Sequence, residues 1–412
     1  MVTSTHTTVR GERNAQSWPQ GVGLRALLLD AFWIIFLFGA SSAPHPLGIQ
    51  NVEGPFWFAG YLAVVAVVLS DNGGFLRLVR KYSIFLMWPM LACLSTIWSL
   101  TPRFSIYHGI QLFMTIMVGF LLCYQASLQR ILQLLFTALL VCAALSVVFA
   151  VAQSQGEWRG VFPHKNVLGH MMCLLLITGF CLFLSGWRPV VSAGAMFLAL
   201  VLLFLSRSGT SVVALAVALC VLPFVVAMRR GSVWFATFLG LSAMGIATFL
   251  LVIEVMGINL VQVVLDALGK DETLTGRTIL WEFGMEALHN RPWLGHGYKA
   301  YWDSPETSAL LLRTVIGQDL WFFHNNFLDV GVAFGYVGIL LLSAGLLLAL
   351  YLTIKKSVTS REYAALWPPI YIVFVLVLST AENPLFQNHS LHQLLFIVAV
   401  AGSVQYGSRP HR

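Results

Sequence analysis

A forty-residue apolar run interrupted by one arginine is the strongest constraint on how this chain folds. Residues 189–228 read PVVSAGAMFLALVLLFLSRSGTSVVALAVALCVLPFVVAM, and Arg207 is their only charged residue. A transmembrane helix needs about 20 apolar residues, so this run is too long for one crossing and suits two. Arg207, with Ser206, Ser208 and Thr210, then lies at the turn between two helices.

The composition places the chain in the membrane. Of its 412 residues, 58% are hydrophobic and only 10% are charged, whereas soluble domains carry about 25% charged residues. The six cysteines fall inside apolar runs and lack CxxC spacing, so we interpret them as small core residues. We therefore predict an all-α polytopic membrane protein.

About twelve transmembrane helices fit the apolar runs, each separated from the next by a breaker or a polar cluster such as Asn72-Gly73-Gly74. The predicted ranges are 24–41, 54–70, 82–99, 104–124, 130–153, 167–186, 189–206, 209–228, 233–254, 325–353, 362–380 and 389–406.

The distribution of Lys and Arg predicts the orientation of these helices. With the N-terminal tail in the cytoplasm, 15 of the 24 basic residues fall on the cytoplasmic side, as the positive-inside rule requires. The short loops on the other side hold only Arg103, Arg159, Lys165 and Arg207. The net charge of +7 is mostly this topology signal and does not indicate nucleic-acid binding.

This topology divides the chain into five segments. Residues 1–23 form a cytoplasmic tail, 24–254 hold helices one to nine, and 255–323 form a long periplasmic loop with short helices. Residues 324–406 hold helices ten to twelve, and 407–412 return to the cytoplasm.

The long loop contains one clear helix pattern and many aromatic residues. The stretch TGRTILWEFGMEALHNRP, 275–292, predicts a helix with Thr275 as a possible N-cap and Pro292 after its end. Aromatic rings anchor proteins at the membrane interface and also stack on sugars, and both interpretations stay open. The rings in question are Trp281, Trp293, Tyr298, Tyr301, Trp302, Trp321, Phe322 and Phe323.

Four polar clusters from distant parts of the chain share the outer face. An arginine or lysine that only extends its charge to the interface needs no hydroxyl or amide neighbours, and these clusters have them. We therefore favour one shared anion-binding site. The clusters comprise Arg159, His164, Lys165 and Asn166; Ser206, Arg207, Ser208 and Thr210; Thr275, Gly276, Arg277 and Thr278; and His324, Asn325, Asn326 and Asp329.

Several chemistries find no motif in the sequence. There is no phosphate loop, dinucleotide fingerprint, HExxH or DxD pair. His389, His392 and nearby Glu382 make a weak metal pattern without further ligands. We therefore expect neither a metal nor a cofactor. Asp30 and Asp329 lie near or inside apolar runs, where a carboxylate either couples protons or makes a hydrogen bond at a helix end.

At these residues the chain resembles a known family. GVFPHKNVLGHMM, LSRSGTS, TGRTILWEFGMEALHNRPWLGHGYKAYW and HNNFLDVGVAFGYVG are similar to the O-antigen ligase and polymerase (Wzy-C) superfamily. The HKN loop and the TGRT segment look closest to its exopolysaccharide-polymerase branch. A ligase-like His with a Gly after ten residues is met by His324 and Gly335, but an Arg-x-x-x-Leu pattern is not met at Arg207, because position 211 is Ser.

The resemblance implies an inverting, metal-independent glycosyl transfer at the periplasmic face of the bacterial inner membrane. The donor would be a glycan on undecaprenyl pyrophosphate. A polymerase would use the next lipid-linked repeat unit as acceptor, and a ligase would use lipid A core or another acceptor. Flippase and chain-length regulator proteins would be its partners, beside the lipid bilayer.

The resemblance also assigns roles to residues. It points to His324 as the catalytic base, a role that the histidine pKa near 6.5 suits, with His164 as second candidate. A histidine that only orients substrate is the alternative. Arginine matches phosphate oxygens, which favours Arg207 and Arg277 for pyrophosphate, supported by Arg159 and Lys165. Asn166, Asn325 and Asn326 would support acceptor binding.

Two other classes of function remain open. A transporter or flippase for the same glycans would also have about twelve spans and a basic cavity, but would more often show broken helices at the midplane and internal repeats. A non-catalytic scaffold in a polysaccharide assembly complex is the other alternative.

Overall fold

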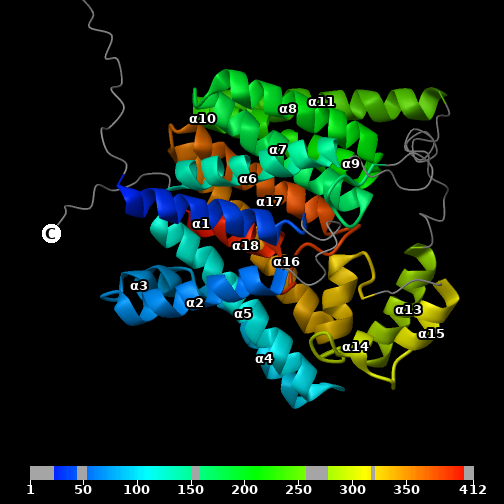
Figure 1. The fold of residues 1–412 in the computed structure, drawn as a ribbon. Helices are drawn as coiled ribbons and strands as arrows, with labels where there is room; N and C mark the ends of the chain where they lie inside the picture. Colours follow the sequence, from blue (N-terminus) through cyan, green and yellow to red (C-terminus); the bar gives the residue numbers. More distant parts are fainter. Residues whose placement is uncertain (1–22, 44–52, 150–157, 257–276, 317–320, 403–412) are drawn as a thin grey trace, which may run out of the picture.

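The computed structural model describes residues 23–43, 53–149, 158–256, 277–316 and 321–402, and all regular secondary structure within them is helical (Figure 1). The helices are α1 (Leu24–Ala40), α2 (Glu53–Ser70), α3 (Gly74–Lys81), α4 (Met87–Leu94), α5 (Pro102–Gln125), α6 (Leu128–Val148), α7 (Lys165–Leu184), α8 (Pro189–Ser206), α9 (Gly209–Leu219), α10 (Val221–Arg230), α11 (Ser232–Met256), α13 (Arg277–Asn290), α14 (Ala300–Asp303), α15 (Ala309–Ile316), α16 (Asn326–Thr359), α17 (Trp367–Leu378) and α18 (Leu391–Ala401), with 3-10 turns at Ser83–Leu86, Ser95–Ile97 and Tyr363–Leu366.

The predicted all-α class is confirmed, and each of the twelve predicted ranges contains helix. Within the described residues, seven helical stretches are long and apolar enough to cross a membrane, or eight if α2 and α3, bent by 113°, form one broken span. Three further apolar stretches, Ser83–Ile97, Tyr363–Leu378 and Leu391–Ala401, are shorter. The protein is thus an integral membrane protein, and the number twelve remains a prediction.

The apolar run that holds Arg207 folds as two helices. α8 ends at Ser206, Arg207 adopts a left-handed backbone conformation with φ 49°, and α9 begins at Gly209. This confirms the turn expected from the length of the run. Arg188, at the other end of α8, also has a positive φ, of 43°. The two arginines therefore mark opposite ends of one apolar helix.

α7 lies at the centre of the bundle and α11 at its edge (Figure 1). α7 packs against α6, α8, α9 and α17, and most of its residues are buried. α11 has no buried residue, although its sequence is strongly apolar. A helix that is apolar all round and buries no residue against protein suits a lipid environment, where its backbone groups are satisfied internally.

The segment between α11 and α16 forms a second, smaller hydrophobic core beside the bundle. It holds Leu280 and Leu288 of α13, Trp302 of α14, and Phe323 and Leu328 at the start of α16. The helix expected over 275–292 is α13, Arg277–Asn290, while its expected cap Thr275 lies outside the described residues. This core ties α13 and α14 to the first turns of α16.

A kink in α16 locks the first half of that helix onto the loop after α13. Gly335 has φ 65° inside the helix, and an added Cβ would lie 2.3 Å from the backbone carbon of Trp293 and 2.4 Å from the carbonyl oxygen of Pro292. The Tyr336 amide donates to the same Pro292 oxygen at 2.7 Å. Only glycine tolerates both the left-handed conformation and the close approach.

We predict that Gly335→Ala destabilises the protein by about 3 kcal/mol, because it adds backbone strain and a steric clash at once. The midpoint of thermal unfolding of detergent-purified protein should fall clearly. Gly194→Ala is the matched control, since Gly194 lies in α8 with no atom within 4 Å of an added Cβ. Equal midpoints for the two variants would contradict the assignment.

Candidate functional site

Two of the predicted outer clusters meet where α7 begins and α8 ends. α7 and α8 pack closely along their length, joined by a short turn, so the start of α7 lies beside the end of α8. His164 caps α7, because its Nδ1 accepts a hydrogen bond from the backbone amide of Asn166 at 3.3 Å. The Ser208 hydroxyl donates to Asn166 Oδ1 at 3.2 Å and contacts the Ser211 hydroxyl at 2.7 Å. The HKN loop and the Arg207 turn are therefore in direct contact.

Gly169 makes this contact possible. It lies one turn after Asn166 in α7, and a Cβ there would come within 2.4 Å of the Ser211 hydroxyl oxygen and 2.7 Å of the Ser208 Cβ. The start of α9 thus packs directly on the α7 backbone. Any side chain at this position would separate Ser208 from Asn166.

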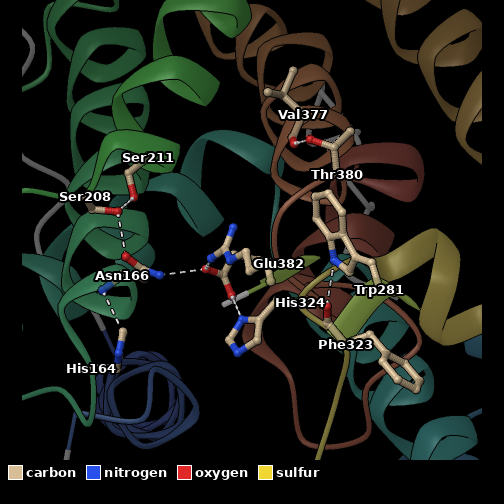
Figure 2. Close-up of polar contacts among 11 residues, drawn as sticks. His164, Asn166, Ser208, Ser211, Trp281, Phe323, His324, Val377, Thr380 and Glu382 are labelled. Carbon is tan, nitrogen blue, oxygen red and sulfur yellow. Dashed lines mark hydrogen bonds and ion pairs between the residues drawn. The ribbon is translucent and has the colours of Figure 1, made fainter. Parts of the chain in front are cut away.

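A buried carboxylate, Glu382, joins this pair to the other two clusters (Figure 2). Glu382 Oε1 accepts from Asn166 Nδ2 at 2.7 Å and from a guanidinium nitrogen of Arg277 at 2.9 Å. Its other oxygen, Oε2, accepts from His324 Nδ1 at 3.1 Å. The Glu382 side chain is 10% exposed, compared with 25% for His324. One carboxylate therefore holds an amide, a guanidinium and an imidazole from three distant segments.

The loop that carries Glu382 is fixed to the start of α16. The Glu382 amide donates to Leu378 O at 2.8 Å, which continues the last turn of α17. Asn326 then fixes the loop on both sides of Glu382. Its backbone amide donates to Ser379 O at 2.9 Å, and its side-chain Oδ1 accepts from the Leu385 backbone amide at 3.1 Å. These bonds keep Glu382 beside His324.

His324 is held from its other side as well. The amide of the preceding Phe323 donates to both carboxylate oxygens of Asp329 at 3.1 Å, and Trp281 Nε1 donates to Phe323 O at 3.0 Å (Figure 2). Asn325 follows His324 and caps α16, its Oδ1 accepting from the Phe327 and Leu328 amides. Asp329 therefore makes the helix-end hydrogen bond that we considered for it.

The surroundings of Glu382 favour its ionised form. Burial alone would raise the pKa of this carboxyl, but the hydrogen bond from His324 and the charges of His170, His324 and Arg277 outweigh burial and lower the pKa to about 2. Glu382 is consequently a carboxylate at neutral pH. It accepts hydrogen bonds and does not donate them.

An ionised Glu382 selects the tautomer of His324. Because the carboxylate can only accept, Nδ1 of the imidazole carries the hydrogen and Nε2 is left as the acceptor in the neutral ring. A carboxylate in this position also stabilises the imidazolium that forms when Nε2 takes up a proton. The pair is therefore equipped to remove a proton from a hydroxyl group.

The remaining predicted cations lie in different settings. Arg207 is exposed at its turn, next to Ser208. Arg277 is largely buried, with its side chain 11% exposed and ion-paired to Glu382. Arg159 is half-buried, and its Nε is buried without a hydrogen-bond partner among the described residues. Lys165 is half-buried at the first position of α7.

Some predicted residues support the site through the backbone. Asn325 and Asn326 use their side-chain oxygens as the helix cap and the loop tie described above, and Asn326 is fully buried. His164 is exposed at the α7 cap.

Of the eight aromatic rings that the sequence analysis named in the long loop, Tyr298, Tyr301, Trp302 and Phe323 are buried. Half of the eight rings therefore serve as core.

Sequence reasoning missed Glu382 as a member of the site. We considered it only beside His389 and His392 as a weak metal pattern, yet it contacts His324, while His389 stacks on Trp57 and His392 hydrogen-bonds Tyr371. Among the residues that the structure describes, no group of three or more His, Cys, Asp or Glu is placed to hold a metal. A signal was present, because a single carboxylate between two apolar helices is costly and tends to be functional.

A narrow aromatic pocket adjoins His324. Trp302, Trp321 and Phe323 line it together with Lys299 and Asp329, and its volume is about 30 Å³. Burial lowers the pKa of Lys299 to about 8, although the Asp329 carboxylate opposes that shift. The pocket has room for about one water molecule and not for a sugar ring.

We predict that Glu382→Gln lowers the free energy of unfolding by about 3 kcal/mol at neutral pH, because Arg277 then keeps a buried charge without its partner. The lowered pKa also sets a pH dependence. The carboxylate stabilises the fold above its unfolded pKa of about 4.5, and this stabilisation is lost as the pH falls toward about 2. Thermal unfolding measured from pH 7 to pH 3 should therefore show a steeper loss for the unmodified protein than for Glu382→Gln.

Glu362→Gln is the control for this measurement, since Glu362 is exposed before α17. It should follow the unmodified protein at every pH. If Glu382→Gln lost stability with falling pH as steeply as the unmodified protein does, the acid dependence would not come from Glu382. This result would contradict its assignment as the stabilising buried carboxylate.

Comparisons with known proteins bear on the same residues. The model of the O-antigen ligase family matches residues 194–343, a range that includes Arg207, Arg277 and His324. The exopolysaccharide production protein ExoQ of Rhizobium meliloti (strain 1021) is 28% identical over 348 residues, which cover 81% of this chain and 77% of that protein. These findings confirm the resemblance of the chain to the O-antigen ligase and polymerase superfamily.

Proposed function

We propose that the protein is an inner-membrane glycosyltransferase that polymerises undecaprenyl-pyrophosphate-linked oligosaccharide repeat units at the periplasmic face. The observation that carries this proposal is the pairing of His324 with the buried Glu382 carboxylate, which also binds Arg277 and Asn166. A proton acceptor and a cation are thereby held together at one end of the bundle. A transfer that removes a proton from a hydroxyl and releases a phosphate needs both.

His324 acts as the base in this scheme. The acceptor hydroxyl attacks the anomeric carbon of the donor sugar, a new carbon–oxygen bond forms, and the hydroxyl proton passes to Nε2 of His324. The bond between the anomeric carbon and the phosphate oxygen breaks, and its electron pair leaves with the lipid pyrophosphate. Attack opposite the leaving group inverts the configuration. Glu382 stabilises the resulting imidazolium through Nδ1.

Arg207 and Arg277 bind the pyrophosphate. Arginine carries five N–H donors, and the contact of Arg277 with Glu382 uses only part of this set. Arg207 is exposed one residue from Ser208, which hydrogen-bonds Asn166. Fixed cations stabilise the charge that grows on the leaving group in the transition state, and no metal takes part in this scheme. Arg159 and Lys165 contribute further positive charge.

The orientation of the chain supports a periplasmic site. Arg188 and Arg207 lie at opposite ends of α8, and the bias of Lys and Arg assigns the Arg188 end to the cytoplasm. The Arg207 end is then periplasmic, together with the residues bonded to it. The lipid tail of the donor would lie against the apolar helices of the bundle.

The type of polysaccharide in the relative's name and a departure from the ligase pattern favour polymerisation over ligation. ExoQ is described as an exopolysaccharide production protein, and the Arg-x-x-x-Leu pattern of ligases is not met at Arg207. The alternative is an O-antigen ligase that transfers the glycan to lipid A core or another acceptor, which the description of the matching family favours. The product separates the two, because a polymerase leaves a longer chain on undecaprenyl pyrophosphate.

We predict that His324→Ala lowers the turnover number for glycan transfer by about 10²–10⁴-fold, since the acceptor hydroxyl loses its proton acceptor. The assay uses purified protein with lipid-linked repeat units and resolves the products by chain length. His289→Ala, which removes an exposed histidine on α13, should keep normal activity. Movement of lipid-linked oligosaccharide across vesicles without new glycosidic bonds would instead identify a transporter.

We predict that Arg207→Lys lowers transfer at least about tenfold, because lysine keeps the charge but loses the planar fork that matches phosphate oxygens. Arg188→Lys is the matched control, as it makes the same change at the opposite end of α8, also at a positive φ. The same assay should leave Arg188→Lys near normal. An equal loss in both variants would indicate a structural effect on α8 and would count against pyrophosphate binding by Arg207.

A further inference from the structure

A polar recess lies outside the His324–Glu382 site, between α13 and the segment that holds α14. Its volume is about 220 Å³, far more than that of the aromatic pocket beside His324. The recess is thus about seven times as large as the aromatic pocket, and it accommodates a polar ligand of the size of one sugar ring. Glu286 and Asn290 of α13 form one side, and Glu306 and Thr307 form the other.

The wall of the recess combines hydrogen-bonding groups with aromatic rings. Glu286, Glu306 and Asn290 offer carboxylate and amide groups to hydroxyls, while Phe283 and Tyr301 offer ring surface. A pyranose ring has this same division, with hydroxyls around its edge and C–H groups on its faces. A purely apolar ligand would leave the carboxylates unsatisfied, which is costly.

The Tyr301 hydroxyl gives independent support for a polar ligand in the recess. The residue is 4% exposed, and its hydroxyl is a buried polar atom without a hydrogen-bond partner of full geometry among the described residues. Ser308 lies within hydrogen-bonding reach of this hydroxyl, in a geometry short of a full hydrogen bond, and both Ser308 and Glu286 line the recess. A buried hydroxyl with only this imperfect contact is not fully satisfied, and a ligand hydroxyl in the recess would complete its hydrogen bonding.

The recess is rigidly connected to the catalytic side. The Tyr301 ring packs against Trp302 and Phe323 at centroid distances of 5.3 Å each, and Phe323 directly precedes His324. His296, on the recess wall, is bonded through its amide and its Nδ1 to Val332 O of α16 at 2.9 and 3.1 Å. A group bound in the recess would thus be held at a fixed position relative to His324.

We propose that this recess binds one neutral pyranose ring of the acceptor glycan, away from the bond that is formed. That the ring belongs to an acceptor rests on the proposed function, whereas saccharide binding itself does not. Arg291 at the recess balances only one of its two carboxylates, so an anionic sugar is disfavoured. A second contact site of this kind orients the acceptor relative to His324.

The test measures binding without any lipid-linked donor. Purified protein in nanodiscs is mixed with methyl β-glucoside, methyl β-galactoside or methyl β-N-acetylglucosaminide, and ring contacts are detected by saturation-transfer NMR. At least one glycoside should bind, and Glu306→Gln and Tyr301→Phe should each weaken it about three- to tenfold, the effect of one lost hydrogen bond. Glu282→Gln, an exposed carboxylate of α13 outside the recess, should bind as the unmodified protein does.

Two results would overturn the proposal. One is the absence of binding by all three glycosides, or binding that Glu306→Gln and Tyr301→Phe leave unchanged. The other is binding of Ca²⁺ that Glu306→Gln abolishes while no glycoside binds. Failure of the proposed function is seen separately, because a protein that binds glycoside through the recess but transfers no glycan keeps the recess and loses the enzyme.

Discussion

The arrangement of the loops at one end of the helix bundle depends on one buried charge. Glu382 lies between two apolar helices, and an ionised carboxylate there must be compensated by donors or it would destabilise the fold. Asn166, Arg277 and His324 supply those donors from three segments. The need to satisfy this carboxylate therefore determines which loops meet at the end of the bundle.

The same contacts also fix the imidazole of His324. A carboxylate that accepts from Nδ1 fixes the imidazole in the tautomer that can take a proton, and it holds a guanidinium beside it. The hydrogen bonds that Asp329 and Trp281 make to Phe323 fix the imidazole from the other direction. One set of contacts thus compensates the buried charge of Glu382 and also positions His324.

Local patterns predicted much of the fold. The helical ranges follow from apolar runs of membrane length, and the turn at Arg207 follows from a run too long for one crossing. The sequence predicts that the HKN loop and Ser208 lie on the same face of the membrane, but not that they are in contact. Spacing along the chain does not reveal which side chains pair. The kink at Gly335 and the bend between α2 and α3 depend on tertiary packing, which periodicity does not record.

By itself the sequence determined the membrane class, the helices and the polar residues at the helix ends, because burial in lipid demands long apolar runs and tolerates charge only at their termini. Only the tertiary structure decided that Glu382 links Asn166, Arg277 and His324, and that a polar recess forms around Tyr301. The physical reason is that a carboxylate's partners are chosen by distance in space. His324 is 58 residues away from Glu382 in the chain and Asn166 is 216.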